Sequence, residues 1–255
     1  MGWIKGVLRV KAGGWIKGAC GVKASGWLKD ADASGAVEVL AGTLLFVVFY
    51  YQAAPAKMAA WLTPTNRPGL GPWLGQAGSF GAGLLLLVIV PVLWWTVGRR
   101  RSPTELGFRV GDWRFGLAAA VVGAFLLTPL LFVNAGNPAF QSTYPLVRAA
   151  GASVSAFIVW ELIYLGYYIA WEGFFRGLLL IGLKDRMGLW PAMVLQTVLS
   201  TVAHFHRPEP ETLAALVAGL GFGWLALRTR SIWYVVLLHW YVGAATDLFC
   251  LLRGF

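Results

Sequence analysis

Acidic residues and cysteines are both scarce in this chain of 255 residues. Only 13% of the residues are charged, about half the usual share, which excludes an ordinary soluble enzyme and a disordered chain. The two cysteines, Cys20 and Cys250, lie near opposite ends and give neither a disulfide framework nor the spacing of a zinc site. No Walker loop is present, and the glycines of GLGFGW at 219–224 are typical of close helix packing inside a membrane span.

Apolar residues dominate the sequence instead. Hydrophobic residues make up 58% of the chain, with 14 tryptophans and 32 glycines. Membrane proteins use tryptophan at the lipid–water boundary and glycine where helices cross. The net charge of +10 is not accompanied by a basic, aromatic-interleaved soluble domain, so it indicates loops facing anionic lipid rather than nucleic acid. We therefore expect an all-α, polytopic transmembrane helix bundle in the cell membrane, surrounded by membrane lipids and with no nucleic-acid partner.

Seven stretches are long and apolar enough to predict membrane spans. They are residues 36–54, 81–97, 115–133, 153–183, 189–203, 213–227 and 232–252. The fourth would be about 46 Å long as a helix and exceeds a hydrocarbon core of ~30 Å, so we expect it to be tilted, kinked or projecting. Arginine-rich loops, the richest at 99–114, alternate with poorer ones, which predicts a cytoplasmic N-terminus and an outer C-terminus.

Residues 1–33 form a separate segment before the predicted transmembrane domain at 34–255. GWIKG, GWIKG and GWLKD recur there and place Trp3, Trp15 and Trp27 at equal spacing. Each step would turn an α-helix by about 120°, so the tryptophans share a face only on an extended chain. Two interpretations remain open, a basic tail lying on the inner membrane surface and a flexible tail without function.

Ionisable residues within the predicted spans are costly and by default indicate a site. They are Glu38, Glu161, Glu172, Arg176, His204, His239 and Asp247. Glu172 and Arg176 are four residues apart and share a helix face. From the rise per residue, Glu172 lies about 16 Å deep, His204 about 22 Å and His239 about 11 Å. These three could converge in one polar cavity, whereas a buried Glu172–Arg176 pair without catalytic role is the alternative.

Three motifs in these spans resemble those of a known family. WEGFFRG at 171–177 is similar to Glu-Glu-x-x-x-Arg, and His204 matches the histidine of Phe-x-x-x-His, followed by HFHRPEPE, which resembles His-x-x-x-Pro-x-x-Glu. His239 begins the third motif, His-x-x-x-Asn. In this order the motifs resemble those of the CAAX protease and bacteriocin-processing family, also called Abi, of intramembrane glutamic endopeptidases. The resemblance covers roughly 101–242.

The chain departs from the family's motifs at three positions. Trp171 stands where the first motif has its first Glu, and Ser200 stands where the second has Phe. Gly243 replaces the Asn of the third motif, which in the family helps to hold an oxyanion. Adjacent helix residues point about 100° apart, so Glu172 does not simply replace its neighbour. Asp247, one turn beyond Gly243, could take over the role of the Asn.

The resemblance implies a metal-independent endopeptidase whose substrate is a peptide or a lipidated protein. Glu172 would act as general base, Arg176 would orient it, His204 would position the water and His239 would polarise the scissile carbonyl. No cofactor is expected; in an alternative version Glu172, His204 and His239 bind a divalent metal with an open fourth position, although the HExxH spacing is absent.

Two functions from other classes remain open. The first is a catalytically silent family member that acts as a membrane binding or immunity-type partner protein. The second is a transporter with a proton relay at the bilayer midplane, to which carboxylates and histidines inside spans also contribute. The sequence gives no indication of the oligomeric state.

Overall fold

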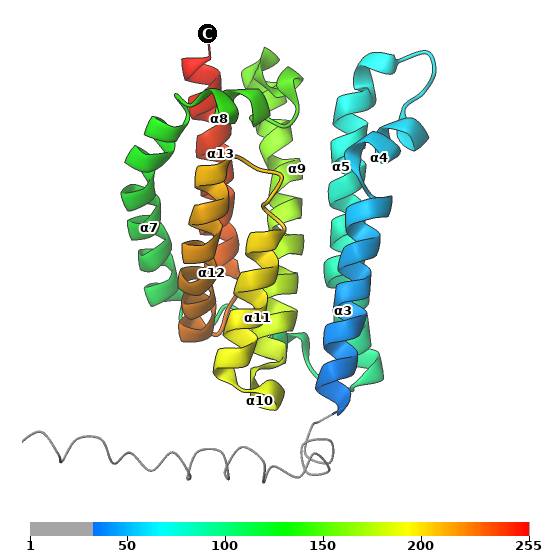
Figure 1. Cartoon of the computed structure of the whole chain (residues 1–255), viewed down its shortest axis with the longest axis vertical. Helices are drawn as coiled ribbons and strands as arrows, with labels where there is room; N and C mark the ends of the chain where they lie inside the picture. The colour runs from blue at the N-terminus through cyan, green and yellow to red at the C-terminus, as the bar shows by residue number, and fades with distance from the viewer. Residues whose placement is uncertain (1–32, 255) are drawn as a thin grey trace, which may run out of the picture.

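A computed structural model describes residues 33–254, and their regular structure is entirely helical. The predicted tail at 1–33 lies outside the described residues, except for Ala33, where the first described helix begins. Six helices of the described part are long and apolar enough to cross a membrane. A seventh, shorter apolar helix packs against α12 and η6, so the all-α bundle of about seven spans is confirmed (Figure 1).

The first half of the chain supplies three long helices and the connections between them. In order these are α3 (Ala33–Gln52), α4 (Pro55–Leu62), η1 (Pro68–Leu70), α5 (Gly71–Gly83), η2 (Leu84–Ile89), α6 (Val90–Leu93), η3 (Trp94–Gly98), η4 (Pro103–Leu106), α7 (Trp113–Asn134), α8 (Pro138–Thr143) and η5 (Arg148–Ala152). Elements α5 to η3 follow one another directly and make a single crossing, 68–98 with the preceding η1.

The second half carries every residue expected to form the site. It contains α9 (Val154–Glu172), η6 (Gly173–Gly182), α10 (Lys184–Met187), α11 (Leu189–Val202), α12 (Glu209–Thr229) and α13 (Trp233–Arg253). Side-chain caps fix two of the long helices: Ser153 accepts from the Ala156 N–H at the start of α9, and Asp112 accepts from the Phe115 N–H at the start of α7.

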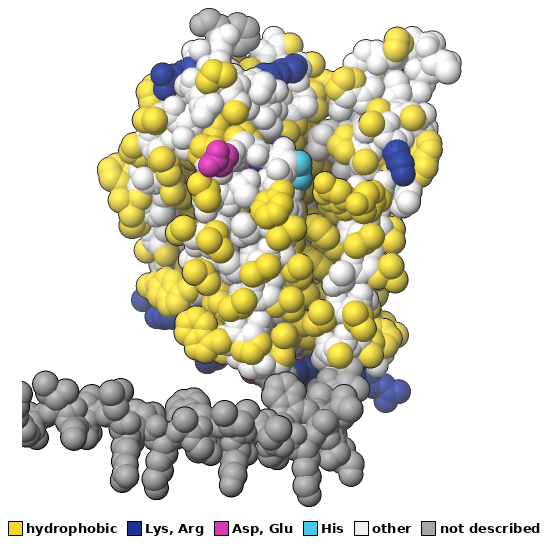
Figure 2. All heavy atoms as spheres, in the orientation of Figure 1, with side chains coloured by type: hydrophobic (Ala, Val, Ile, Leu, Met, Phe, Trp, Pro, Cys, Tyr) yellow, Lys and Arg dark blue, Asp and Glu magenta, His cyan; other side chains and the backbone are white. Residues whose placement is uncertain are grey.

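The sides of the bundle are covered with apolar side chains (Figure 2). Phe125 is 77% exposed and Leu162 is 60% exposed, values typical of a surface that faces lipid rather than water. The loops between η3 and α7, between η6 and α11 and between α12 and α13 gather at the end drawn lowest in Figure 1, together with the start of α3. We call this the arginine-rich end, because it carries Arg99, Arg109, Arg186 and Arg230.

The long fourth span changes its winding at Glu172. The α-helix ends at that residue, and a π-helical stretch continues from Gly173 to Gly182. A Cβ at Gly173 would meet Val88 at 2.7 Å, and one at Gly177 would meet the backbone oxygen of Leu106 at 3.0 Å, so the wider helix packs directly on its neighbours. Interruptions of this kind are frequent at functional sites.

Two aromatic core clusters meet beside Glu172. One contains Trp171, Phe174 and Phe175, while the other contains Tyr164 and Tyr168. Glu172 follows Trp171 and lies one turn after Tyr168, and its side chain is 0% exposed. The arrangement gives that part of the bundle a low effective dielectric, in which charged contacts are stronger than in water.

Candidate active site

Glu172 and Arg176 form a fully buried ion pair, as their spacing predicts. The side chain of Glu172 is 0% exposed and that of Arg176 is 2% exposed. Nε of Arg176 lies 3.2 Å from Oε2 of Glu172, and Nη1 donates to Oε1 at 3.2 Å. Both carboxylate oxygens therefore face the guanidinium group, which fixes the orientation of the carboxylate.

Helix α13 brings His239 to the same carboxylate. Nδ1 of His239 lies 2.6 Å from Oε1 of Glu172. An ionised carboxylate can only accept, so the proton of this bond belongs to Nδ1, and Nε2 of a neutral ring is left as an acceptor. The imidazole is 18% exposed, whereas Glu172 is 0% exposed. Of the two groups, His239 is the one that an incoming molecule can reach.

Aromatic rings enclose the imidazole of His239. The ring of Tyr168 lies with its centroid 4.6 Å away and that of Phe222 lies 5.4 Å away. Phe222 also lies under the guanidinium group of Arg176, 5.5 Å from the ring centroid. These contacts hold the imidazole in one orientation and keep the ionic group Glu172–Arg176–His239 away from lipid.

His204 lies near this group but not inside a helix. The sequence counts it with the ionisable residues of the spans, at the end of the fifth (189–203), whereas α11 ends at Val202 and His204 lies in the turn that follows. Nδ1 of His204 lies 2.6 Å from the carbonyl oxygen of Ser200, and the Thr212 hydroxyl donates to the His204 carbonyl at 2.7 Å. The turn is therefore anchored on both α11 and α12, with the histidine at its start.

Trp171 fills the space beside His204. The indole is 4% exposed, and its centroid lies 5.2 Å from the imidazole of His204 and 4.6 Å from the ring of Phe175. The first Glu of the family's motif would stand at this position. The structure thus brings Glu172, Arg176 and His239 into direct contact, while His204 faces an indole instead of a carboxylate.

Tyr168 takes the space that an asparagine at position 243 would need. It lies one turn before Glu172 on α9, and a Cβ built on Gly243 would overlap its hydroxyl group. Sequence reasoning did not single out this tyrosine. The signal was present in the four-residue spacing to Glu172 and in the glycine that replaces Asn on the facing helix.

Asp247 does not take over the role of the missing Asn. Its carboxylate accepts from the indole Nε1 of Trp160 at 2.6 Å and interacts with the carboxyl group of Glu161. Trp160 is fully buried, so this contact ties α13 to α9 two turns away from His239. The two acids, which the sequence grouped with the site residues, form a separate interior cluster.

A second polar cluster holds the turn that carries His204. The hydroxyl of Tyr144 donates to the carboxylate of Glu211 and lies 2.7 Å from each of its oxygens. Arg207 lies over the ring of Tyr144, 5.6 Å from its centroid. Burial raises the pKa of Tyr144 well above its usual range, so the hydroxyl remains a donor at neutral pH. These contacts fix the start of α12 next to the turn.

Metal ligands do not assemble in the described part of the chain. Within residues 33–254, no group of three His, Cys, Asp or Glu side chains is arranged to hold a metal ion. Glu172 and His239 already bond to each other, and His204 bonds to the backbone of Ser200.

Comparison with known proteins finds one family model that this part of the chain resembles. Residues 153–245 match the family model described as "Type II CAAX prenyl endopeptidase Rce1-like". The matched segment runs from the start of α9 into α13 and contains Glu172, Arg176, His204 and His239. The resemblance drawn from the three motifs is thereby confirmed, and the matching family is one of proteases. No curated protein and no solved structure matches the chain.

Proposed function

We propose that this protein is a multi-pass intramembrane endopeptidase that hydrolyses a peptide bond of a lipidated protein or peptide without a metal ion. The observation that carries the proposal is the 2.6 Å bond between Glu172 and His239 at the centre of the segment that matches a prenyl endopeptidase family. By the positive-inside rule, the arginine-rich end faces the cytoplasm of a cell membrane.

The imidazole of His239 accepts a proton from the attacking water. Arg176 holds Glu172 on both oxygens, so we assign Glu172, which the family resemblance makes the general base, to orienting His239 instead. Nε2 of His239 removes the proton as the water oxygen bonds to the scissile carbonyl carbon. The same proton then passes to the leaving nitrogen as the C–N bond breaks, so Glu172 acts in activation through His239.

Two further groups complete the proposed chemistry. The hydroxyl of Tyr168, at the place of the family's Asn, donates to the carbonyl oxygen as negative charge develops on it. His204, anchored by Ser200 and Thr212, positions the water or the peptide from the opposite side. This assignment retains the four residues that the sequence indicates and adds Tyr168.

A silent relative is the second candidate, and one contact favours it. The indole of Trp171 occupies the side of His204 on which the family's motif places a carboxylate. If that carboxylate is indispensable, the ionic group would only hold α9 and α13 together, and the protein would act by binding another membrane protein. The silent role predicts the same fold and no hydrolysis.

Cleavage of a prenylated peptide separates the two candidates. The purified full chain in nanodiscs would receive a farnesylated peptide ending in Cys, two aliphatic residues and one further residue, and mass spectrometry would detect the released tripeptide. We expect cleavage that a chelator does not inhibit, that His239→Gln abolishes and that His206→Gln retains. His206 is the matched control because it is exposed and lies outside the ionic group. Absence of cleavage by the unaltered protein would contradict the protease and favour the silent role.

A further inference from the structure

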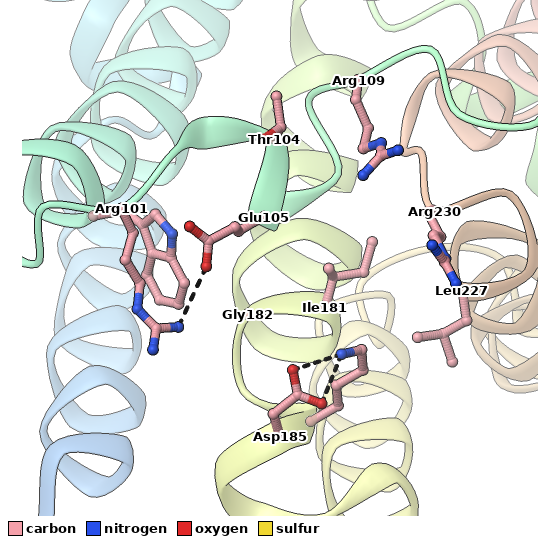
Figure 3. Close-up of a pocket in the computed structure, with 11 residues that line it drawn as sticks. Arg101, Thr104, Glu105, Arg109, Ile181, Gly182, Asp185, Leu227 and Arg230 are labelled. Carbon is pink, nitrogen blue, oxygen red and sulfur yellow. Dashed lines mark hydrogen bonds and ion pairs between the residues drawn. The ribbon is translucent and has the colours of Figure 1, made fainter.

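A pocket of about 380 Å³ opens at the arginine-rich end, away from the candidate active site. The loop after η3, the junction of η6 and α10 and the turn between α12 and α13 line it together (Figure 3). Its charged lining residues are Arg101, Glu105, Arg109, Lys184, Asp185 and Arg230. None of the residues proposed for hydrolysis contributes to this pocket.

Two of the four basic residues are neutralised inside the pocket. Nη1 of Arg101 lies 3.5 Å from Oε2 of Glu105, and Nζ of Lys184 lies 2.8 Å from Oδ1 of Asp185. Arg109 and Arg230 have no such partner in residues 33–254, since neither guanidinium group forms a hydrogen bond or an ion pair there. Figure 3 shows both guanidinium groups on the same side of the pocket. The lining therefore has two positive charges in excess.

The two arginines are carried by loops that the backbone ties together. The amide of Ile232 donates to the carbonyl of Gly107 at 3.1 Å, and the amide of Asp112 donates to the carbonyl of Thr229 at 3.1 Å. Arg230 itself has a φ of 54°, a left-handed conformation that costs free energy in a residue other than glycine. The loops hold two like charges near each other against their repulsion.

We propose that Arg109 and Arg230 bind a phosphate-bearing anion in this pocket. Guanidinium groups match phosphate oxygens in geometry, and two of them without a carboxylate partner favour a group with more than one oxygen. Exposed tryptophans at the same end, Trp94, Trp113 and Trp224, are typical of the lipid–water boundary. The phosphate of an anionic lipid headgroup and a soluble phosphate share the required chemistry.

Thermal unfolding of the full chain in nanodiscs tests the proposal. We expect phosphatidylcholine nanodiscs that also contain phosphatidylglycerol to raise the melting temperature of the unaltered protein. The pair Arg109→Gln/Arg230→Gln should weaken the apparent affinity for the anion by about tenfold or more, the scale of one lost charged hydrogen bond. The matched pair Arg100→Gln/Arg114→Gln removes the same charge at the same end, outside the pocket, and should keep the rise.

Inorganic phosphate added to phosphatidylcholine nanodiscs distinguishes the two sources. A rise in melting temperature with phosphate alone, lost in the Arg109/Arg230 pair, identifies a soluble anion; a rise only with phosphatidylglycerol identifies the lipid headgroup. Equal losses in the two double variants would overturn the proposal, because they would reflect the charge of the whole surface. The absence of any rise would also overturn it. If the double variant does not fold, Arg109→Gln and Arg230→Gln are tested separately. Each single variant should lose part of the rise in melting temperature.

Discussion

Glu38 and Glu172 are both buried glutamates that contact two nitrogen-bearing side chains, but their partners differ in kind. Glu38 binds Arg99, with Nε 2.9 Å from Oε1, and also Arg186. These arginines come from the end of η3 and from α10, so the cluster joins three parts of the chain at the arginine-rich end. Glu172 binds Arg176 of its own helical segment and His239 of α13.

The difference separates a structural clamp from a reactive group. In the Glu38 cluster both partners are arginines, which have no nitrogen that can accept a proton. In the Glu172 cluster one partner is an imidazole, whose second nitrogen can accept one. The proposed hydrolysis therefore depends on the imidazole partner of Glu172, which the Glu38 cluster lacks.

Replacing Glu172 with Gln should have the largest effect. The change leaves the guanidinium group of Arg176, 2% exposed, without a counter-charge, which we expect to cost about 3–5 kcal/mol of unfolding free energy. Cleavage of the farnesylated peptide should disappear as well. Denaturation in nanodiscs measures the first effect, and a loss similar to that of an exposed control such as Glu105→Gln would contradict the buried pair.

Replacing His239 with Gln should separate chemistry from stability. Glu172 keeps its bond to Arg176, so we expect the unfolding free energy to change by less than about 1.5 kcal/mol, the scale of one hydrogen bond. The rate of cleavage should fall by about 100-fold or more, because the general base is lost. A variant that is folded and cleaves at the original rate would exclude His239 from the reaction.

Replacing Glu38 with Gln should lower stability and leave cleavage unchanged. Arg99 and Arg186 would lose their contacts with the carboxylate of Glu38, which we expect to cost about 1–3 kcal/mol. Cleavage per folded molecule should stay unchanged, since the cluster lies at the arginine-rich end and far along α3 from the site. Reduced cleavage at full folding would show that the two glutamates are not as distinct as their partners suggest.

Replacing Gly243 with Ala should reveal the place of Tyr168. The new methyl group would overlap the phenol, and forcing a group into a packed interior costs about 1–3 kcal/mol. Combining it with Tyr168→Ala removes the overlap, so the double variant should be more stable than the sum of the single changes predicts. Additive losses would mean that the hydroxyl does not occupy this position.

Replacing Asp112 with Asn should give the smallest effect and probe an exposed pair. The Phe115 N–H and then Arg228 hold the pKa of this carboxyl below its usual range, so it stabilises the fold above the unfolded pKa of about 3.9. The contribution is lost as the pH falls through the lower folded value. We expect a small decrease in melting temperature at neutral pH that vanishes in acid; a decrease independent of pH would contradict the charge effect.

The fold and the ionic pair follow from local patterns, whereas the position of His204 does not. Apolar runs predict the long helices, and the four-residue spacing predicts the contact of Glu172 with Arg176. The contact of His239 with Glu172 could be predicted only from the order of the family's motifs. The depth of a residue along its helix does not show which face of α13 packs against which face of α9.

Two features lie outside what periodicity can predict. Helix α11 ends at Val202, and the turn that follows is held by the contacts of His204 with Ser200 and Thr212. Likewise Asp247 pairs with Trp160, a partner 87 residues away in the chain. Such contacts depend on side chains brought together by the folded bundle.

The early end of α11 also affects how water could reach the site of the proposed hydrolase. A helix of 14 residues spans about 21 Å, less than a hydrocarbon thickness of ~30 Å, so unwound backbone completes this crossing. Backbone N–H and C=O groups outside a helix need hydrogen-bond partners within the hydrocarbon region. Only other protein groups or water in a crevice can supply them there. We therefore expect the turn at His204 to be hydrated, with faster solvent exchange at its amides than anywhere on α9.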